Sequence, residues 1–249
     1  MVMAMKNYMM VLSYDGSRYL GWQGQGNTEN TIEHKVETVL QRLTGEQTKM
    51  QASGRTDAGV HALAQPVTFQ LSRSLDCHLL LTELNRYLPE DIGVLSLSPA
   101  PERFHARLSA RSKIYVYRIW NSPAPDVFGR KYRYQISDSL DLQAMEQAAR
   151  QLEGEHDFRS FCGLKRFKKS TVREIYQISF SRTGDELALR FHGNGFLNRM
   201  VRILAGTLIE VGLGLRSPES MTEVLAAEDR SAAAGALPAH GLMLEEVFY

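Results

Sequence analysis

The sequence has few of the features that mark secreted or membrane-bound proteins. Only two cysteines occur, Cys77 and Cys162, and they form no CxxC pair, which indicates a reducing compartment. No apolar run approaches the length that spans a bilayer. The methionine-rich start, Met1 to Leu12, is interrupted by Lys6 and Asn7 and offers no signal-peptide core. We therefore predict a cytoplasmic protein with no membrane partner.

Cofactor and metal motifs are also lacking. Gly24-Gln25-Gly26 begins a GxGxxG pattern, but Glu29 stands where the third glycine belongs. The seven histidines show neither HExxH nor clustered ligand spacing. The sequence thus predicts no cofactor and no metal, and it disfavours a nucleotide-dependent enzyme and a metal hydrolase.

A large net charge is missing too, since the formal value is +1. Basic residues nevertheless gather locally. Eight lie between positions 103 and 133 against the single acid Asp126, and four more lie between positions 165 and 169. Such clusters suit contacts with phosphate groups. Taken alone, they are more typical of a solvated surface.

Apolar periodicity gives the order of elements in the first half of the chain. We predict strands at 8–14, 48–52, 67–71 and 92–97. Thr31 caps a helix that Gly45 ends, and a second helix around 79–84 ends before Pro89. The resulting order, βαββαβ, is the ferredoxin-like pattern.

The second half repeats this order. We predict strands at 113–120, 176–180, 187–191 and 242–249, and helices at 140–152, 197–211 and from Pro218 onward. The predicted fold class is therefore α+β, with two ferredoxin-like halves, residues 1–102 and 103–249. Their mostly antiparallel sheets are expected to be continuous, with helices on one face and a groove between the halves.

One connection, Ser53 to His61 (SGRTDAGVH), is longer and more polar than a hairpin needs. Small residues surround Asp57, so that a ligand can approach its carboxylate closely. Arg55 lies two residues before it and favours the ionised acid. An ordinary turn with a surface ion pair is the alternative, because aspartate is common in such turns.

The helix around Arg202 is apolar on both sides, with Leu197, Leu204 and Ile209 spread round it. We therefore expect a buried helix and a buried Arg202, which needs an acidic or phosphate partner. Glu210 is poorly placed on the same helix, so we predict Asp57 as the partner. Alternatively, the side chain reaches the helix surface and water.

Tyr115 and Tyr117 share one face of their strand. An aromatic ring on a sheet beside basic residues can stack on a nucleobase. Such a tyrosine is as a rule part of the core, and this alternative stays open.

The chain resembles the TruA family of tRNA pseudouridine synthases over nearly its whole length. The most specific match is GRTDAGVH, and weaker ones occur in the family's order. These are Tyr14-Asp15-Gly16, Gly21-Trp22-Gln23, Leu88-Pro89, Asp91-Ile92, Phe104-His105-Ala106-Arg107, Tyr115-x-Tyr117, His156-Asp157-Phe158, Gly195-Phe196-Leu197, Met200-Val201-Arg202, Gly206-Thr207-Leu208 and Gly241-Leu242.

The resemblance implies isomerisation of uridine to pseudouridine at positions 38, 39 and 40 of the tRNA anticodon stem-loop, without a cofactor. It implies that Asp57 is the nucleophile, that Arg55 helps to flip the target base, that Tyr115 stacks on the uracil and that Arg202 pairs with the aspartate. It also implies the pseudouridine synthase fold with a central RNA-binding cleft, and a homodimer holding one tRNA. The matched substrate-contacting residues are Phe104, His105, Arg107 and Leu242.

Two departures and two alternatives accompany this resemblance. Ile203 stands where the family commonly has asparagine, and Met243 where it commonly has tyrosine. Both put details of the pocket wall in doubt.

A non-catalytic protein with two ferredoxin-like RNA-binding modules is one alternative, although no RNP1-like string occurs. A pseudouridine synthase acting on other RNA sites is the second.

Overall fold

The computed structural model describes residues 5–24, 26 and 28–249. Two sequence predictions touch residues outside this range: the methionine-rich start includes Met1–Ala4, and the glycine-rich stretch includes Gln25. The chain divides into unit 1, residues 1–111 with 244–249, and unit 2, residues 112–243. None of the described helices is long and apolar enough to cross a membrane.

Unit 1 has the predicted βαββαβ order, which is thereby confirmed. Its elements are β1 (Lys6–Tyr14), α1 (Ile32–Thr44), β2 (Gln51–Ala52), β3 (His61–Leu71), α2 (Cys77–Tyr87) and β4 (Ile92–Pro99), and the last residues of β10 (Leu242–Phe248) join them. The strand order is β4-β1-β3-β10, and β2 pairs with β3. The β1–β3 and β1–β4 pairs are antiparallel.

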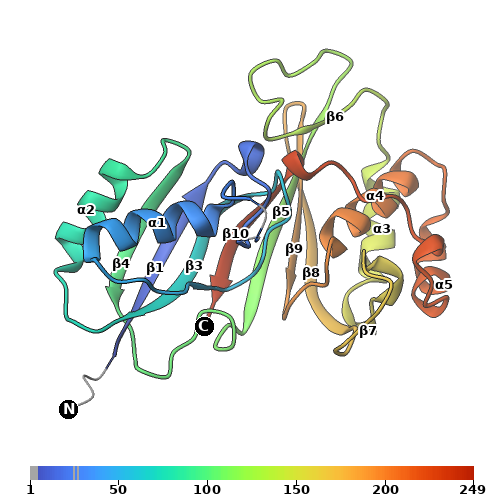
Figure 1. The fold of residues 1–249 in the computed structure, drawn as a ribbon. Helices are drawn as coiled ribbons and strands as arrows, with labels where there is room; N and C mark the ends of the chain where they lie inside the picture. The colour runs from blue at the N-terminus through green and yellow to red at the C-terminus, as the bar shows by residue number, and fades with distance from the viewer. Residues whose placement is uncertain (1–4, 25, 27) are drawn as a thin grey trace. The chain divides into compact units, whose positions relative to one another are not determined.

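Local sequence signals explain these elements. The side chain of Thr31 accepts a hydrogen bond from the His34 amide and begins α1, and Gly45 ends it with φ at 75°. Val36 and Leu40 on α1 are fully buried, and β1 alternates between buried and partly exposed residues. Figure 1 shows α1 and α2 on the same side of the unit 1 strands.

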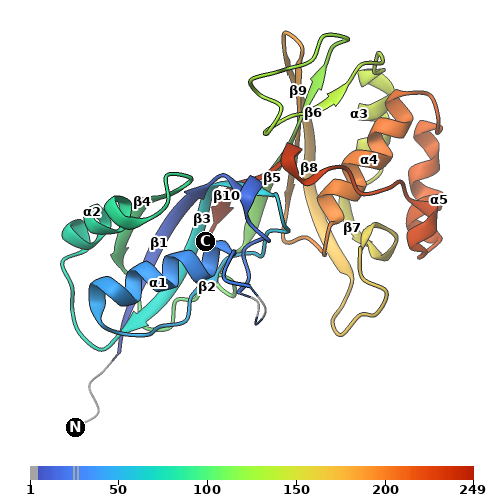
Figure 2. The same cartoon turned by 45° about the horizontal axis from the view of Figure 1, so that its top comes forward.

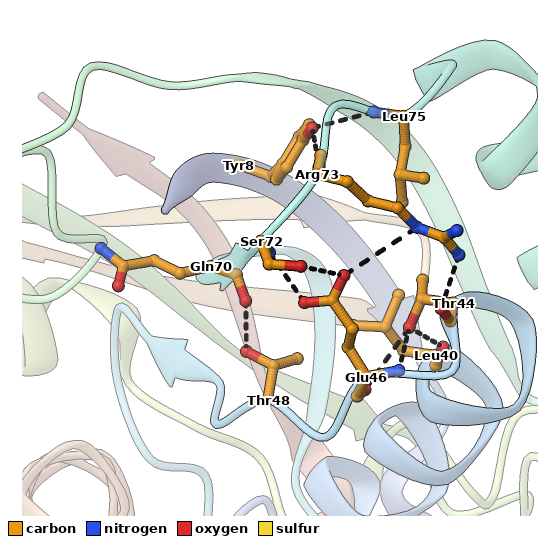
Figure 3. A network of polar contacts seen from close by, with 9 residues as sticks. All are labelled: Tyr8, Leu40, Thr44, Glu46, Thr48, Gln70, Ser72, Arg73 and Leu75. Atoms are coloured by element: carbon orange, nitrogen blue, oxygen red, sulfur yellow. Dashed lines mark hydrogen bonds and ion pairs between the residues drawn. The ribbon is translucent and has the colours of Figure 1, made fainter. Parts of the chain in front are cut away.

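A polar network fastens the chain after α1 to the chain after β3 (Figure 3). The carboxylate of Glu46 accepts hydrogen bonds from the Ser72 amide at 2.7 Å and the Ser72 hydroxyl at 2.8 Å. Arg73 donates to the carbonyl of Thr44 at 2.6 Å. These bonds tie the chain that leads into β2 to the chain that follows β3.

Unit 2 contains two short strands that the sequence did not predict, β6 (Tyr134–Ile136) and β7 (Gly154–Asp157). The others are β5 (Ser112–Asn121), α3 (Leu142–Arg150), β8 (Val172–Thr183), β9 (Glu186–Gly193), α4 (Met200–Gly212) and α5 (Met221–Ala226). The strand order is β5-β9-β8-β7, and β6 pairs parallel to β5. In Figure 2 the three helices lie on one side of these strands.

The α+β class with mostly antiparallel strands is confirmed. Residues 103–111 belong to unit 1, as does the end of β10, because that strand lies beside β3. The division into functional halves at 102/103 stays a prediction.

Candidate functional site

The connection between β2 and β3 alternates between anchored and outward-facing residues. Ser53, Thr56 and Val60 are buried, with 0%, 6% and 2% of their surface exposed. Asp57 is half-buried and Arg55 is exposed. The loop therefore holds part of its backbone inside, while the side chains of Asp57 and Arg55 stay accessible to solvent.

Side-chain hydrogen bonds hold this loop at its start and beside Asp57. The Ser53 hydroxyl donates to Gln65 Oε1 at 2.6 Å, and Gln65 Nε2 donates to the Gly54 carbonyl at 2.6 Å. Gln65 is fully buried, so losing either bond would leave a polar group unsatisfied. Directly before Asp57, the hydroxyls of Thr56 and Tyr14 are 2.8 Å apart.

Two glycines let the segment after β1 lie directly against the loop. A Cβ on Gly16 would meet the carbonyl oxygen of Val60 at 2.0 Å. A Cβ on Gly21, whose φ is 94°, would meet the carbonyl oxygen of Thr56 at 2.7 Å. The next amide, that of Trp22, donates to this same carbonyl at 3.0 Å. The Tyr14-Asp15-Gly16 and Gly21-Trp22-Gln23 motifs thus support the backbone on either side of Asp57.

The segment carrying Phe104, His105 and Arg107 is fixed to unit 1 by side chains distant in the sequence. Asn7 Nδ2 donates to the carbonyls of Pro101 at 2.7 Å and Phe104 at 2.9 Å. The Ala106 amide donates to the hydroxyl of Thr68 at 3.2 Å. Through these bonds the segment holds Arg107 at a defined place although the side chain is exposed.

The last residue of the chain belongs to the same arrangement. The Tyr249 hydroxyl donates to the Ala106 carbonyl at 3.0 Å, and its ring lies 4.9 Å from that of Phe104. Burial raises the pKa of Tyr249 above its usual value. His105 accepts the Arg107 amide at Nδ1, 3.1 Å away, and turns the chain there. Sequence reasoning missed Tyr249 and Asn7, because neither carries a chemical motif.

Arg55 and Arg107 line one pocket of about 290 Å³. The structure therefore brings together two of the predicted RNA-contacting residues, which are far apart in sequence. Lys49 also lines it, and so do Glu33 and Glu37 of α1.

Tyr115 lies in β5 of unit 2 and is 8% exposed. Its ring meets that of Phe196 edge to face, with centroids 5.3 Å apart, and Phe191 is its cross-strand neighbour. Phe196 was not among the predicted site residues, although the Gly195-Phe196-Leu197 match contained it. The edge contact fixes the orientation of the Tyr115 ring.

Arg202 differs from its prediction. Helix α4 is buried along nearly all its length, as expected, but Arg202 is only partly buried. Its Nε donates to the carbonyl of Leu237 at 2.6 Å. Glu210 accepts from Arg216 at 3.0 Å, in line with the expectation that it does not serve Arg202. The pairing of Arg202 with Asp57 stays a prediction.

The chain that leads into β10 is fastened along α4 and β5. The Thr207 hydroxyl accepts from the Ala234 amide at 3.2 Å, and a Cβ on Gly206 would meet the Gly235 carbonyl at 2.5 Å. The Tyr117 hydroxyl donates to the Pro238 carbonyl at 2.8 Å. The Gly206-Thr207-Leu208 motif and Tyr117 are thus structural in unit 2.

The two departures from the family pattern fall on buried positions. Ile203 is fully buried in α4, and Met243 packs in a cluster with Val116 and Ala188. Leu242, a predicted substrate-contacting residue, is 6% exposed as the first residue of β10. These side chains belong to the apolar interior of unit 2.

Part of the first basic cluster is neutralised by neighbouring acids. Arg133 bonds Asp126 at 2.5 Å and Glu186 at 2.6 Å, and Arg118 bonds Glu186 at 2.9 Å. The cluster between positions 165 and 169 lies on an exposed stretch.

No group of three or more histidine, cysteine, aspartate or glutamate side chains among the described residues is arranged to hold a metal ion.

Comparison with known proteins identifies the family. The model of a tRNA pseudouridine synthase family matches residues 10–108 and 148–249. A tRNA pseudouridine synthase A from Bacillus sp. (strain KSM-64) is 44% identical over 98% of this chain and all of its own length. Enzymes of the same name from Halalkalibacterium halodurans and Brevibacillus brevis are 45% and 42% identical, over 96% and 98% of this chain and 91% and 100% of their own. The chain therefore belongs to the tRNA pseudouridine synthase family.

Proposed function

We propose that this protein isomerises uridine to pseudouridine in tRNA, with Asp57 as the nucleophile. The observation that carries the proposal is the β2–β3 loop, whose buried anchors present Asp57 on a rigid backbone within a segment matched by the family model. A rigid support is what catalysis by a single carboxylate requires, because a displaced nucleophile loses orientation.

The reaction breaks the N1–C1′ bond of the nucleoside, turns the uracil and joins C5 to C1′. The C5 proton then leaves to solvent and N1 takes up a proton, so that the product is an isomer of the substrate and no redox partner is needed. We assign to Asp57 either attack on C1′ or stabilisation of the positive charge that develops there. The target nucleotide must leave its stack to be reached, and we assign that step to Arg55.

Tyr115 is proposed to stack on the detached uracil and Arg202 to pair with the Asp57 carboxylate. For Tyr115, the contact with Phe196 supports this role, because it holds the ring in a fixed orientation. We propose positions 38, 39 and 40 of the anticodon stem-loop as targets, a homodimer as the active form and the cytoplasm as the location.

Tritium release from tRNA labelled at uridine C5 tests the reaction. The isomerase releases tritium in proportion to the pseudouridine formed, whereas a non-catalytic RNA-binding protein releases none and would overturn the proposal. Mapping pseudouridine in tRNA from cells with and without the gene tests the positions. Loss of pseudouridine elsewhere, with 38–40 unchanged, would favour other RNA sites.

A further inference from the structure

The pocket that Arg55 and Arg107 share has an acidic wall and a basic rim. Glu33 and Glu37 stand one turn apart on α1 and form the wall, while Lys49, Arg55 and Arg107 line the same pocket and are exposed. Met50, which directly precedes β2, also lines the pocket and is buried. At about 290 Å³ the pocket has the size of a small ligand site.

Each carboxylate uses one oxygen to hold the protein together. Oε2 of Glu33, a residue that is 8% exposed, accepts from Gln23 Nε2 and from the Gly24 amide. Oε1 of Glu37 accepts from the Met50 amide at 2.9 Å. The second oxygen of each has no donor among the described residues. The wall therefore offers fixed hydrogen-bond acceptors and no donors of its own.

Burial raises the pKa of Glu37, and the nearby Glu33 adds to the rise. A ligand that donates hydrogen bonds relieves both carboxylates, since a donor satisfies the free oxygens and lowers their repulsion. A ligand that presents oxygen atoms to the same wall would be repelled.

We propose that this pocket binds a second, non-target nucleotide of the substrate RNA, whose base presents an amino group to Glu33 and Glu37 while Arg55 and Arg107 hold its phosphate. Cytosine, adenine and guanine carry such a group, and carboxylates accept hydrogen bonds from base amino groups. Uracil carries a carbonyl where cytosine has its amino group and is therefore bound less well at this wall. This inference rests on the proposed function, because it makes the pocket a specificity site for the same RNA.

Cytidine and uridine 5′-monophosphate form a matched pair of probes, since they share the ribose and phosphate and differ at the base edge. We expect cytidine monophosphate to shift the ¹³C-methyl resonance of Met50, assigned through Met50→Leu, with at least about tenfold higher affinity than uridine monophosphate. Equal affinities, or a Met50 methyl that responds to neither nucleotide in the millimolar range, would overturn the proposal.

Glu37→Gln tests the wall itself, because the amide keeps an oxygen for the Met50 amide and turns a donor toward the pocket. The preference for cytidine monophosphate should fall about tenfold or reverse. Glu90→Gln removes the same charge from an exposed position of unit 1 and should leave the preference as in the wild type. A preference unchanged in Glu37→Gln would show that the carboxylate does not contact the base.

The measurements also separate this inference from the proposed function. Discrimination between the nucleotides by a protein that releases no tritium from tRNA would support the pocket and refute the isomerase. Tritium release without discrimination would refute the pocket alone. With both intact, Glu37→Gln should raise the KM for tRNA and leave kcat within a few-fold, since Glu37 is not assigned to the chemistry.

Discussion

The hydroxyl of Tyr249, the last residue of the chain, donates a 3.0 Å hydrogen bond to the carbonyl of Ala106, 143 positions earlier. Ala106 lies between His105 and Arg107, and its own amide is bound by Thr68. The C-terminal residue thus sets the position of a segment assigned to RNA binding, without being assigned any contact with RNA itself.

Tyr249→Phe should weaken the binding of tRNA and leave the rate of the chemical step nearly unchanged. The variant keeps the ring contact with Phe104 and loses the bond to Ala106, at a cost of about 0.5–1.5 kcal/mol in the free energy of unfolding. Steady-state tritium release should show a higher KM for tRNA at nearly unchanged kcat. Tyr87→Phe, at an exposed ring on α2, is the control. Wild-type KM in Tyr249→Phe would show that the segment does not depend on this bond.

Asp57→Ala should lower turnover by at least about a thousandfold, because the nucleophile is removed. The affinity for tRNA, measured by filter binding, should stay within a few-fold, and the free energy of unfolding should change little, since the side chain is not one of the buried anchors. Appreciable turnover in this variant would remove Asp57 from its assigned role.

Gly21→Ala should disturb the loop through its backbone. The added Cβ meets the Thr56 carbonyl at 2.7 Å, and φ at 94° is strained for alanine, so we expect a loss of about 1–3 kcal/mol in the free energy of unfolding. At a temperature where the variant is still folded, its turnover should also be lower than that of the wild type. Gly93→Ala, where nothing lies within 4 Å of the Cβ, should behave as the wild type does.

Arg202→Met should destabilise unit 2 by about 1.5–3 kcal/mol, because the Leu237 carbonyl loses a charged donor. Arg202→Lys keeps the charge without the guanidinium geometry. If Arg202 acts on Asp57 through charge, the lysine variant retains far more turnover than the methionine variant in the tritium assay. If the two variants lose turnover and stability to the same extent, Arg202 acts by holding the Leu237 carbonyl and not through its charge.

Acid should weaken the network around Glu46. Hydrogen bonds from Ser72, its amide first, lower the pKa of Glu46 in the folded protein. The carboxylate therefore stabilises the fold above its unfolded pKa of about 4.3, and this contribution is lost as the pH falls through the lower folded pKa. Glu46→Gln should lower the unfolding temperature at pH 7 and have less effect near pH 3. An equal effect at both pH values would contradict this linkage.

Some features could be predicted from the sequence because they depend on neighbouring residues. Thr31 and Gly45 mark the ends of α1, since a cap and a left-handed residue act within one turn. The apolar residues round α4 predicted its burial, because helical period alone determines which sides carry them. The loop around Asp57 was recognisable from its small residues and its family match, which needs no coordinates.

Other features were decided only by tertiary structure, because they depend on contacts between residues far apart in the chain. Periodicity placed Arg202 inside a buried helix, but its side chain is long enough to leave the interior and bond Leu237. No local pattern marks Tyr249 as the support of Ala106, and none places Arg107 beside Arg55 and Glu37 in one pocket. Short strands such as β6 exist because a neighbouring strand pairs with them, so a three-residue stretch has no signal of its own.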